Sequence, residues 1–242
     1  MIIMEIKDNK RKIIQKFAFL CFLTLLFSSL TGLANDKDIQ INKSNSLSLI
    51  THESIFIDND NNFTDYGFSG AGTKNSPYII ENYNITTTVE YGLVVVNTTK
   101  HFIIRNCYVD AFQRGIKITN ASDNTVTISN NICPNNNFAG IHISETNYVT
   151  VSNNTCPNTL AEGGIAIFHS SHVNITDNTC IKTKQNYGIY IYKSHYCLIT
   201  NNLVKENRLH GIYVSSESSN CVIHHNSIID NNLEGTSQAW DS

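Results

Sequence analysis

Two acidic residues near the end of the chain have the spacing of a carboxylate pair. Glu206 and Asp230 lie 24 residues apart, which equals the period of a repeat that fills this part of the sequence. Residues one period apart occupy equivalent places in neighbouring units, so their carboxylates are expected to lie close together. Glycosidases use two carboxyl groups about 5–9 Å apart. The pair is therefore a candidate for the catalytic acids of a carbohydrate-active enzyme. A solvated turn, its charge partly compensated by Lys182 and Lys205, is the interpretation that we favour.

Aromatic side chains recur at the same period and form three expected columns on the outside of the repeat. Rings surrounded by Asn, Ser and Thr combine an apolar body with polar groups, which suits the binding of an extended polysaccharide. Packing between neighbouring strands is the alternative interpretation. The first column contains Tyr148, His172 and Tyr196, the second Tyr190 and Tyr213, and the third Phe168 and Tyr192.

The histidines do not predict a metal centre. His224 and His225 are consecutive in an expected strand, so we expect their side chains to point to opposite sides. No column stacks two histidines, and no cluster of Met or Cys accompanies them outside the core. The run Asp58–Asn62 resembles the start of a calcium loop, but Phe63 and Ser69 stand where such a loop needs glycine and glutamate. We therefore predict no cofactor, with calcium and copper as unsupported alternatives.

Five of the cysteines fall into two columns of otherwise apolar residues. Such positions favour buried thiols that act as small hydrophobic side chains. Cys133, Cys156 and Cys180 form one column, and Cys197 and Cys221 are neighbours in the other. The pair Cys197–Cys221 is the best candidate for a disulfide, provided that its geometry is suitable.

These residues are positioned by a repeat of short strands. Glycines recur at intervals of 23, 25, 24, 24 and 23 residues, and strict alternation of apolar residues after each glycine indicates a strand. A second strand follows in every unit, and a third apolar position comes after the next bend. The glycines are Gly92, Gly115, Gly140, Gly164, Gly188 and Gly211.

Asparagine is abundant in this chain, with 33 residues, and many fall at one bend of the repeat. Asparagine tolerates left-handed backbone conformations, and stacked side-chain amides can hydrogen-bond one another. We predict a structural ladder at this bend. Its asparagines are Asn106, Asn130, Asn131, Asn153, Asn154, Asn178, Asn201, Asn202 and Asn226.

Repeats of the form GIxIxxS followed by VxIxxNxx resemble those of right-handed parallel β-helix proteins, in particular the NosD-type and pectate-lyase-like superfamily. The segments 52–63 and 70–85 also look like the preamble of secreted NosD-type proteins, with Pro77–Glu81 as the first coil. The resemblance implies an all-β fold, a single right-handed parallel β-helix of about seven coils. It implies no single activity, because the superfamily includes polysaccharide lyases, hydrolases, epimerases, adhesins and a copper-centre maturation factor.

The N-terminus reads as an export signal. Basic residues precede an apolar run from Phe17 to Leu30, and Gly32 and Ala34 suit a cleavage site before Asn35. We expect a signal peptide at residues 1–34, a flexible lead-in at 35–51 and the β-helix at 52–242. The run is short for a membrane span, so cleavage is the favoured interpretation and an uncleaved anchor is the alternative. The expected location is secreted, at the cell surface or periplasmic, and a formal charge of -3 gives no footprint for nucleic acid.

The last repeat ends close to the end of the sequence, which leaves an open edge expected at residues 228–242. Either the chain is truncated or this edge is capped by end-to-end association. The leading functional hypothesis is a non-catalytic exported protein that binds polysaccharide or a cell-surface partner through its outward columns. A carbohydrate-active enzyme, either a lyase or a hydrolase, is the first alternative. A NosD-like periplasmic factor for copper-centre assembly is the second.

Overall fold

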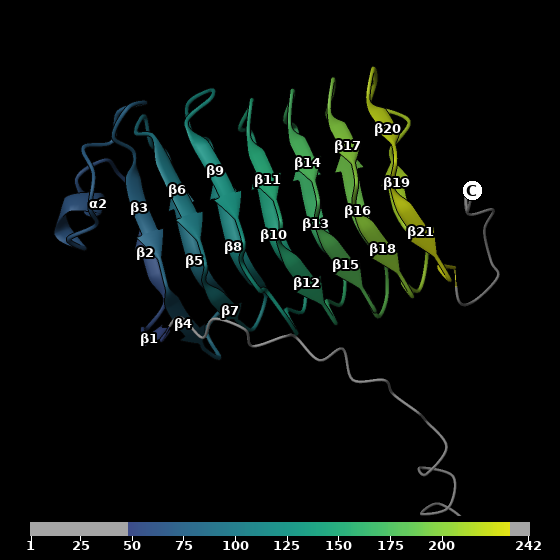
Figure 1. The fold of residues 1–242 in the computed structure, drawn as a ribbon, viewed down its shortest axis with the longest axis horizontal. Coiled ribbons are helices and arrows are strands. Elements are labelled where there is room, and N and C mark those ends of the chain that lie inside the picture. The colour runs from purple at the N-terminus through teal and green to yellow at the C-terminus, as the bar shows by residue number, and fades with distance from the viewer. Residues whose placement is uncertain (1–47, 233–242) are drawn as a thin grey trace, which may run out of the picture. The chain divides into compact units, whose positions relative to one another are not determined.

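The computed structural model describes residues 48–232 (Figure 1). The predicted signal peptide, most of the predicted lead-in and residues 233–242 lie outside this part of the chain. The predicted lead-in extends to residue 51, and its last two residues form a strand. Strand β1 (Ile50–Thr51) already pairs in parallel with β4 (Tyr83–Thr86), because its backbone completes the ladder at one edge of the sheet.

The described chain winds into a parallel β-helix with three faces (Figure 1). Sheets 1 and 2 have seven strands each, and within each sheet every strand pairs in parallel with the equivalent strand of the next coil. This confirms the predicted all-β right-handed β-helix. Sheet 1 contains β2 (Ile55–Ile57), β5 (Tyr91–Val96), β8 (Arg114–Thr119), β10 (Ala139–Ser144), β13 (Gly163–Phe168), β16 (Tyr187–Tyr192) and β19 (Ile212–Val214).

Sheet 2 contains β3 (Tyr78–Glu81), β6 (Phe102–Arg105), β9 (Val126–Ser129), β11 (Thr150–Ser152), β14 (Asn174–Thr176), β17 (Leu198–Thr200) and β20 (Val222–His224). The third face is built from two shorter sheets that the bridges of Ile132 to Tyr108 and Thr155 join. Its strands are β1, β4 and β7 (Tyr108–Asp110), then β12 (Thr155–Pro157), β15 (Thr179–Ile181), β18 (Leu203–Lys205) and β21 (Ser227–Ile229).

The interior consists of the predicted apolar columns. Ile104, Ile128 and Ile175 are fully buried, as are Cys156 and Cys180 on the third face. At the N-terminal end, the short helix α2 (Asn62–Asp65) packs its buried Phe63 against Tyr78, with parallel rings 4.7 Å apart. Ile223 is the last member of its column among the described residues and is 44% exposed. The core is therefore covered at its first coil and open at the last described coil.

The recurring glycines let two faces of the coil approach closely. A Cβ atom on Gly188 would lie 2.3 Å from Cγ1 of Val204, a distance that side chains do not tolerate. Gly140 and Gly164 face Cys156 and Cys180 in the same way, at 2.8 and 2.9 Å. The glycine period of the sequence thus marks contact between sheet 1 and the third face.

Left-handed backbone conformations recur at several bends of every coil. Twelve asparagines have positive φ, between 52° and 61°, which agrees with the tolerance of asparagine for this region. Other residue types occupy the same columns: Glu145, Tyr148, His169, His172, Asp177, Lys182, Lys193, Tyr196, Glu206, His225 and Asp230. Position in the coil, rather than residue type alone, therefore determines this conformation.

The predicted asparagine ladder is confirmed at the bend between sheet 2 and the third face. Asn178 donates from Nδ2 to Oδ1 of Asn202 at 3.0 Å and to the carbonyl of Val151 at 2.9 Å, and its Oδ1 accepts from the backbone N–H of Asn154 at 2.9 Å. The buried members of the ladder are Asn131, Asn154, Asn178 and Asn202, followed by the partly buried Asn226. The preceding residues Asn106, Asn130, Asn153 and Asn201 supply the left-handed turn.

Candidate binding surface

The outward face of sheet 1 carries a continuous column of side chains through all seven strands. The strand register aligns these residues directly above one another along the helix axis, with an expected spacing of about 4.8 Å per coil. The column begins with two apolar residues, continues with a lysine, a histidine and an alanine, and ends with two tyrosines. From the N-terminal end it contains Phe56, Val94, Lys117, His142, Ala166, Tyr190 and Tyr213.

The C-terminal half of this face is an aromatic cluster. Tyr187 and Tyr213 stack with centroids 4.5 Å apart and ring planes 9° apart, and Tyr190 meets Tyr213 at 5.6 Å and a tilt of 53°. Phe168 approaches Tyr190 edge-on at 5.2 Å and Tyr192 at 5.4 Å. All five side chains are half-buried. The register places Tyr190 beside Tyr213 and Phe168 beside Tyr192, as the expected columns require.

An ionic cluster adjoins the aromatic residues. Glu162 lies in the loop before β13, and its carboxylate folds back over sheet 1. It accepts hydrogen bonds from both Nε and Nη2 of Arg114, the former at 3.0 Å, and from Nδ1 of His142 at 2.9 Å. The His142 ring stacks on Phe168 at 5.1 Å, and Nζ of Lys117 lies 4.8 Å from the centre of the Tyr91 ring. Charged and aromatic groups thus form one connected surface.

Burial and charge shift the titration of this cluster. Burial alone would raise the pKa of Glu162, but the hydrogen bonds from His142 and Arg114 outweigh it and lower this pKa to about 2. Burial lowers the pKa of His142, although Glu162 opposes the shift. Burial and the neighbouring Arg114 also lower the pKa of Lys117. At neutral pH the carboxylate and guanidinium are charged, and His142 donates to Glu162 without needing a second proton.

Tyr148, His172 and Tyr196 form a separate ladder at the turn that leads into sheet 2. Their rings stack with centroid separations of 4.4 and 5.0 Å and plane angles of 12° and 16°. This stack covers both faces of His172 and one face of each tyrosine, so a ligand would meet mainly edges and hydroxyl groups. The same column contains Asn124 and Asn220 in the flanking coils, also with positive φ. The ladder is exposed, with Tyr148 at 46% and Tyr196 at 54%.

Glu206 and Asp230 occupy equivalent turns of neighbouring coils, as their spacing predicts. The backbone N–H of Glu206 donates to the carbonyl of Ile229 at 3.1 Å, and both acidic residues have positive φ. The Glu206 carboxylate lies 2.9 Å from Nζ of Lys205. This salt bridge raises the pKa of Lys205. The pair remains a prediction as a catalytic site.

The expectation for His224 and His225 is wrong. Their Nδ1 atoms are 2.5 Å apart, and the rings meet edge to face at 4.8 Å. Strict alternation fails because His225 has φ of 54°, which turns its side chain towards that of its neighbour. Two histidines on this exposed edge do not complete a metal site, and no group of three or more candidate ligands occurs within residues 48–232.

The remaining sequence candidates have structural explanations. All six cysteines of the described chain are free thiols, including Cys197 and Cys221. The turn that resembles the start of a calcium loop directs Asp60 to the hydroxyls of Thr98 and Thr99, at 2.6 and 2.7 Å. Within the described range, no helix has the length and apolar character to cross a lipid bilayer.

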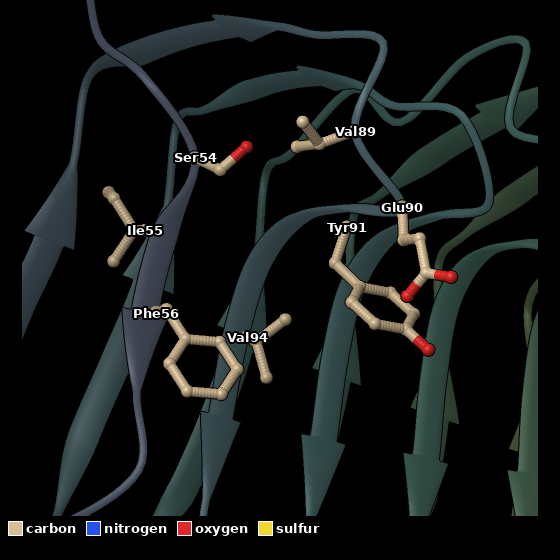
Figure 2. Close-up of a pocket in the computed structure, with 7 residues that line it drawn as sticks. All are labelled: Ser54, Ile55, Phe56, Val89, Glu90, Tyr91 and Val94. Carbon is tan, nitrogen blue, oxygen red and sulfur yellow. The ribbon is translucent and has the colours of Figure 1, made fainter.

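A pocket of about 270 Å³ lies at the N-terminal end of the same outward face. Figure 2 shows Phe56 and Val94 side by side on β2 and β5, with the Ser54 hydroxyl directed towards the side of Val89. Phe56 and Val89 are 53% and 54% exposed. Ser54 Oγ is buried and has no hydrogen-bond partner among the described residues. Because Phe56 and Val94 begin the outward column, this pocket lies at the N-terminal end of that column.

Sequence reasoning missed most of the ionic cluster and part of the aromatic one. Tyr187 and His210 stack on Tyr213, and each directly precedes a periodic glycine. Comparing the residue before each glycine would have revealed them. Glu162 gave no such signal, because it lies in a loop and meets Arg114 across 48 residues.

Comparison with known proteins identifies the repeat but no individual relative. The family model described as "Right handed beta helix region" matches residues 26–156 and 123–242. No curated protein and no solved structure matches the chain.

Proposed function

The chain belongs to the right-handed beta helix family, and from this premise we propose that it is an exported protein that binds polysaccharide along the outward face of sheet 1. The supporting observation is the continuous surface that joins the aromatic cluster to the Arg114–Glu162–His142 cluster. Export is supported by the predicted signal at residues 1–34. The proposal assigns binding and no catalytic step.

The geometry favours this face over the exposed Tyr148–His172–Tyr196 ladder. Aromatic residues bind sugars through their ring faces and polar tips. In the exposed ladder, stacking covers most of the ring faces. Tyr190 instead meets its neighbouring rings at tilts of 53° to 76°. Tilted contacts leave more of the Tyr190 ring face available to a ligand, whereas Tyr213 stacks on Tyr187 and His210. The polar groups of Arg114, Glu162 and Lys117 lie beside this aromatic surface and can orient hydroxyl groups.

The length of the surface also suits an extended ligand. Seven strands at about 4.8 Å each give a column on the order of 30 Å along the helix axis. A polymer lying parallel to this axis would contact several coils at once. Weak contacts repeated along one chain add to a useful affinity, since later contacts are intramolecular.

Two double variants, each of which replaces two tyrosines, distinguish the two surfaces. We expect Tyr190→Ala with Tyr213→Ala to weaken polysaccharide binding at least ten-fold, measured by a glycan array and then by calorimetry with the best ligand. Tyr148→Asn with Tyr196→Asn removes two exposed tyrosines but places in their column the residue that Asn124 and Asn220 already supply. This control should bind as the unmodified chain does. Equal loss in both variants, or no loss in the first, would contradict the proposed surface.

A further inference from the structure

We propose that the pocket at the N-terminal end of sheet 1 binds the acetamido group of an N-acetylated sugar. This inference rests on the polysaccharide-binding function proposed above and names the class of its ligand. The pocket is lined by Ser54, Phe56, Val89, Glu90, Tyr91 and Val94, together with Ile55.

One side of the pocket is an apolar wall suited to a methyl group. Phe56 and Val89 remain more than half exposed, although both are large apolar side chains. Val94 lies beside Phe56 in the strand register and is almost fully buried, at 3% exposure. Figure 2 shows Phe56, Val89 and Val94 around the same hollow. A small apolar substituent placed here would remove this surface from water, which is favourable.

The polar groups of the pocket, Ser54 Oγ and the Glu90 carboxylate, can pair with one hydrogen-bond acceptor and one donor of a ligand. Ser54 Oγ is buried without a partner among residues 48–232, and a buried hydroxyl without a hydrogen bond is costly. The exposed Glu90 carboxylate accepts one hydrogen bond from Nε2 of Gln113, at 3.2 Å, and has further lone pairs. An acetamido group supplies a carbonyl that can accept from the Ser54 hydroxyl and a methyl group for the apolar wall, while Glu90 can accept from another group of the sugar. A sugar hydroxyl supplies no methyl group.

The size and position of the pocket fit a single substituted sugar of a longer chain. Its volume of about 270 Å³ falls below the roughly 300–1,000 Å³ of sites that enclose a drug-sized ligand. Val94 is followed in the same outward column by Lys117 and His142. A chain with its substituent in the pocket can therefore continue along sheet 1 towards the aromatic cluster.

Two hexasaccharides with the same backbone test the inference on the full chain. The β-1,4-linked hexamers of N-acetylglucosamine and glucose differ at carbon 2, where the former has an acetamido group and the latter a hydroxyl. By calorimetry, we expect the N-acetylglucosamine hexamer to bind at least ten-fold more tightly. Ser54→Ala and Phe56→Ala should each reduce this preference several-fold and leave the affinity for the glucose hexamer unchanged. Ser216→Ala, at an exposed turn serine, serves as the matched control.

The outcomes separate this inference from the function on which it rests. Equal affinity for the two hexamers would overturn the acetamido assignment while leaving polysaccharide binding intact. A preference that survives both pocket variants would overturn the pocket. If Ser54→Ala lowers the thermal unfolding temperature without changing the preference, the Ser54 hydroxyl stabilises the fold and does not contact the ligand, which also overturns the inference. Failure of the full chain to bind any polysaccharide on the array would contradict the proposed function itself.

Discussion

Oε2 of Glu162 lies 2.9 Å from Nδ1 of His142, on the outward face of a sheet that is otherwise largely aromatic and apolar. Arg114 donates to the same carboxylate, so Glu162 links strands β8 and β10 to the loop before β13. Because Glu162 is 18% exposed, this contact is only weakly screened by water. Its titration therefore affects the stability of the fold as well as the chemistry of the surface.

Stability should fall in acid because of this carboxylate. The folded-state pKa of Glu162 is lowered to about 2 from 4.5, so its contribution is present above about pH 4.5 and is lost as the pH falls towards 2. Urea unfolding should show a loss on the order of 3 kcal/mol across this range from this group. Glu162→Gln should be less stable at pH 7 and should lose less stability between pH 4.5 and pH 2. An identical pH profile in the variant would rule out Glu162 as the source.

His142 adds a second acid-sensitive step at higher pH. Burial lowers its pKa in the folded state, so below about pH 6.5 the unfolded chain takes up a proton before the folded chain does. The free energy of unfolding should therefore decrease as the pH falls through about 6.5. His142→Gln should remove this step, and chemical-shift titration of the ring protons should give a pKa below the ordinary value. A raised value would show that Glu162 outweighs burial.

The asparagine ladder should contribute more stability than the turn asparagines beside it. Asn178→Ala removes donors to Val151, Thr176 and Asn202 and leaves the backbone N–H of Asn154 without its acceptor. We expect a loss of about 4 kcal/mol in urea unfolding, since each of the four lost hydrogen bonds costs about 1 kcal/mol. Asn201→Ala changes an exposed left-handed residue one position from Asn202 and should cost about 1 kcal/mol. Comparable losses in the two variants would contradict the ladder's role.

The exposed ladder should accept asparagine more readily than alanine. Asparagine at Tyr148 loses ring stacking worth about 1 kcal/mol but relieves the left-handed strain of a bulky residue by a similar amount. Alanine loses the stacking and keeps the strain. We expect the midpoint of urea unfolding to be nearly unchanged for Tyr148→Asn and lower for Tyr148→Ala. A stabilised alanine variant would exclude this explanation.

Cys221 should be the reactive thiol among the described cysteines. The hydrogen bond with Cys197 lowers the pKa of Cys221 to about 6, while that contact and burial raise the pKa of Cys197. Timed alkylation with iodoacetamide, read by peptide mass spectrometry, should label Cys221 first, with a half-maximal rate at a pH below that of an ordinary thiol. Cys197→Ser should move this midpoint towards that of a free thiol, about 8.5. Faster labelling of Cys133, which is fully buried, would contradict the assignment.

Much of the fold could be predicted because each coil repeats the same physical problem. Gly188 must lie against Val204, and Ile199 must face inward, so these constraints appear in the sequence at a fixed period. The asparagine bend was predictable for the same reason. The pairing of His224 with His225 was not, because one left-handed residue breaks the alternation that the prediction assumed.

The candidate surface was only partly predictable. Tyr190 and Tyr213 occupy repeat positions and could be placed beside one another from their spacing. Glu162 acts from a loop, where no repeat fixes the direction of a side chain, so its contacts with Arg114 and His142 left no pattern. Periodicity records what every coil shares, whereas a binding surface depends on what individual coils do differently.

The left-handed columns influence how such a surface can change by mutation during evolution. Asn124, Tyr148, His172, Tyr196 and Asn220 adopt the same backbone conformation with very different side chains. Since the turn is held by the stacked backbone on either side, mutation at one coil can alter local chemistry without requiring compensation in its neighbours. The scaffold can therefore diversify one coil at a time, and new recognition properties can arise through single substitutions while the interior stays constant.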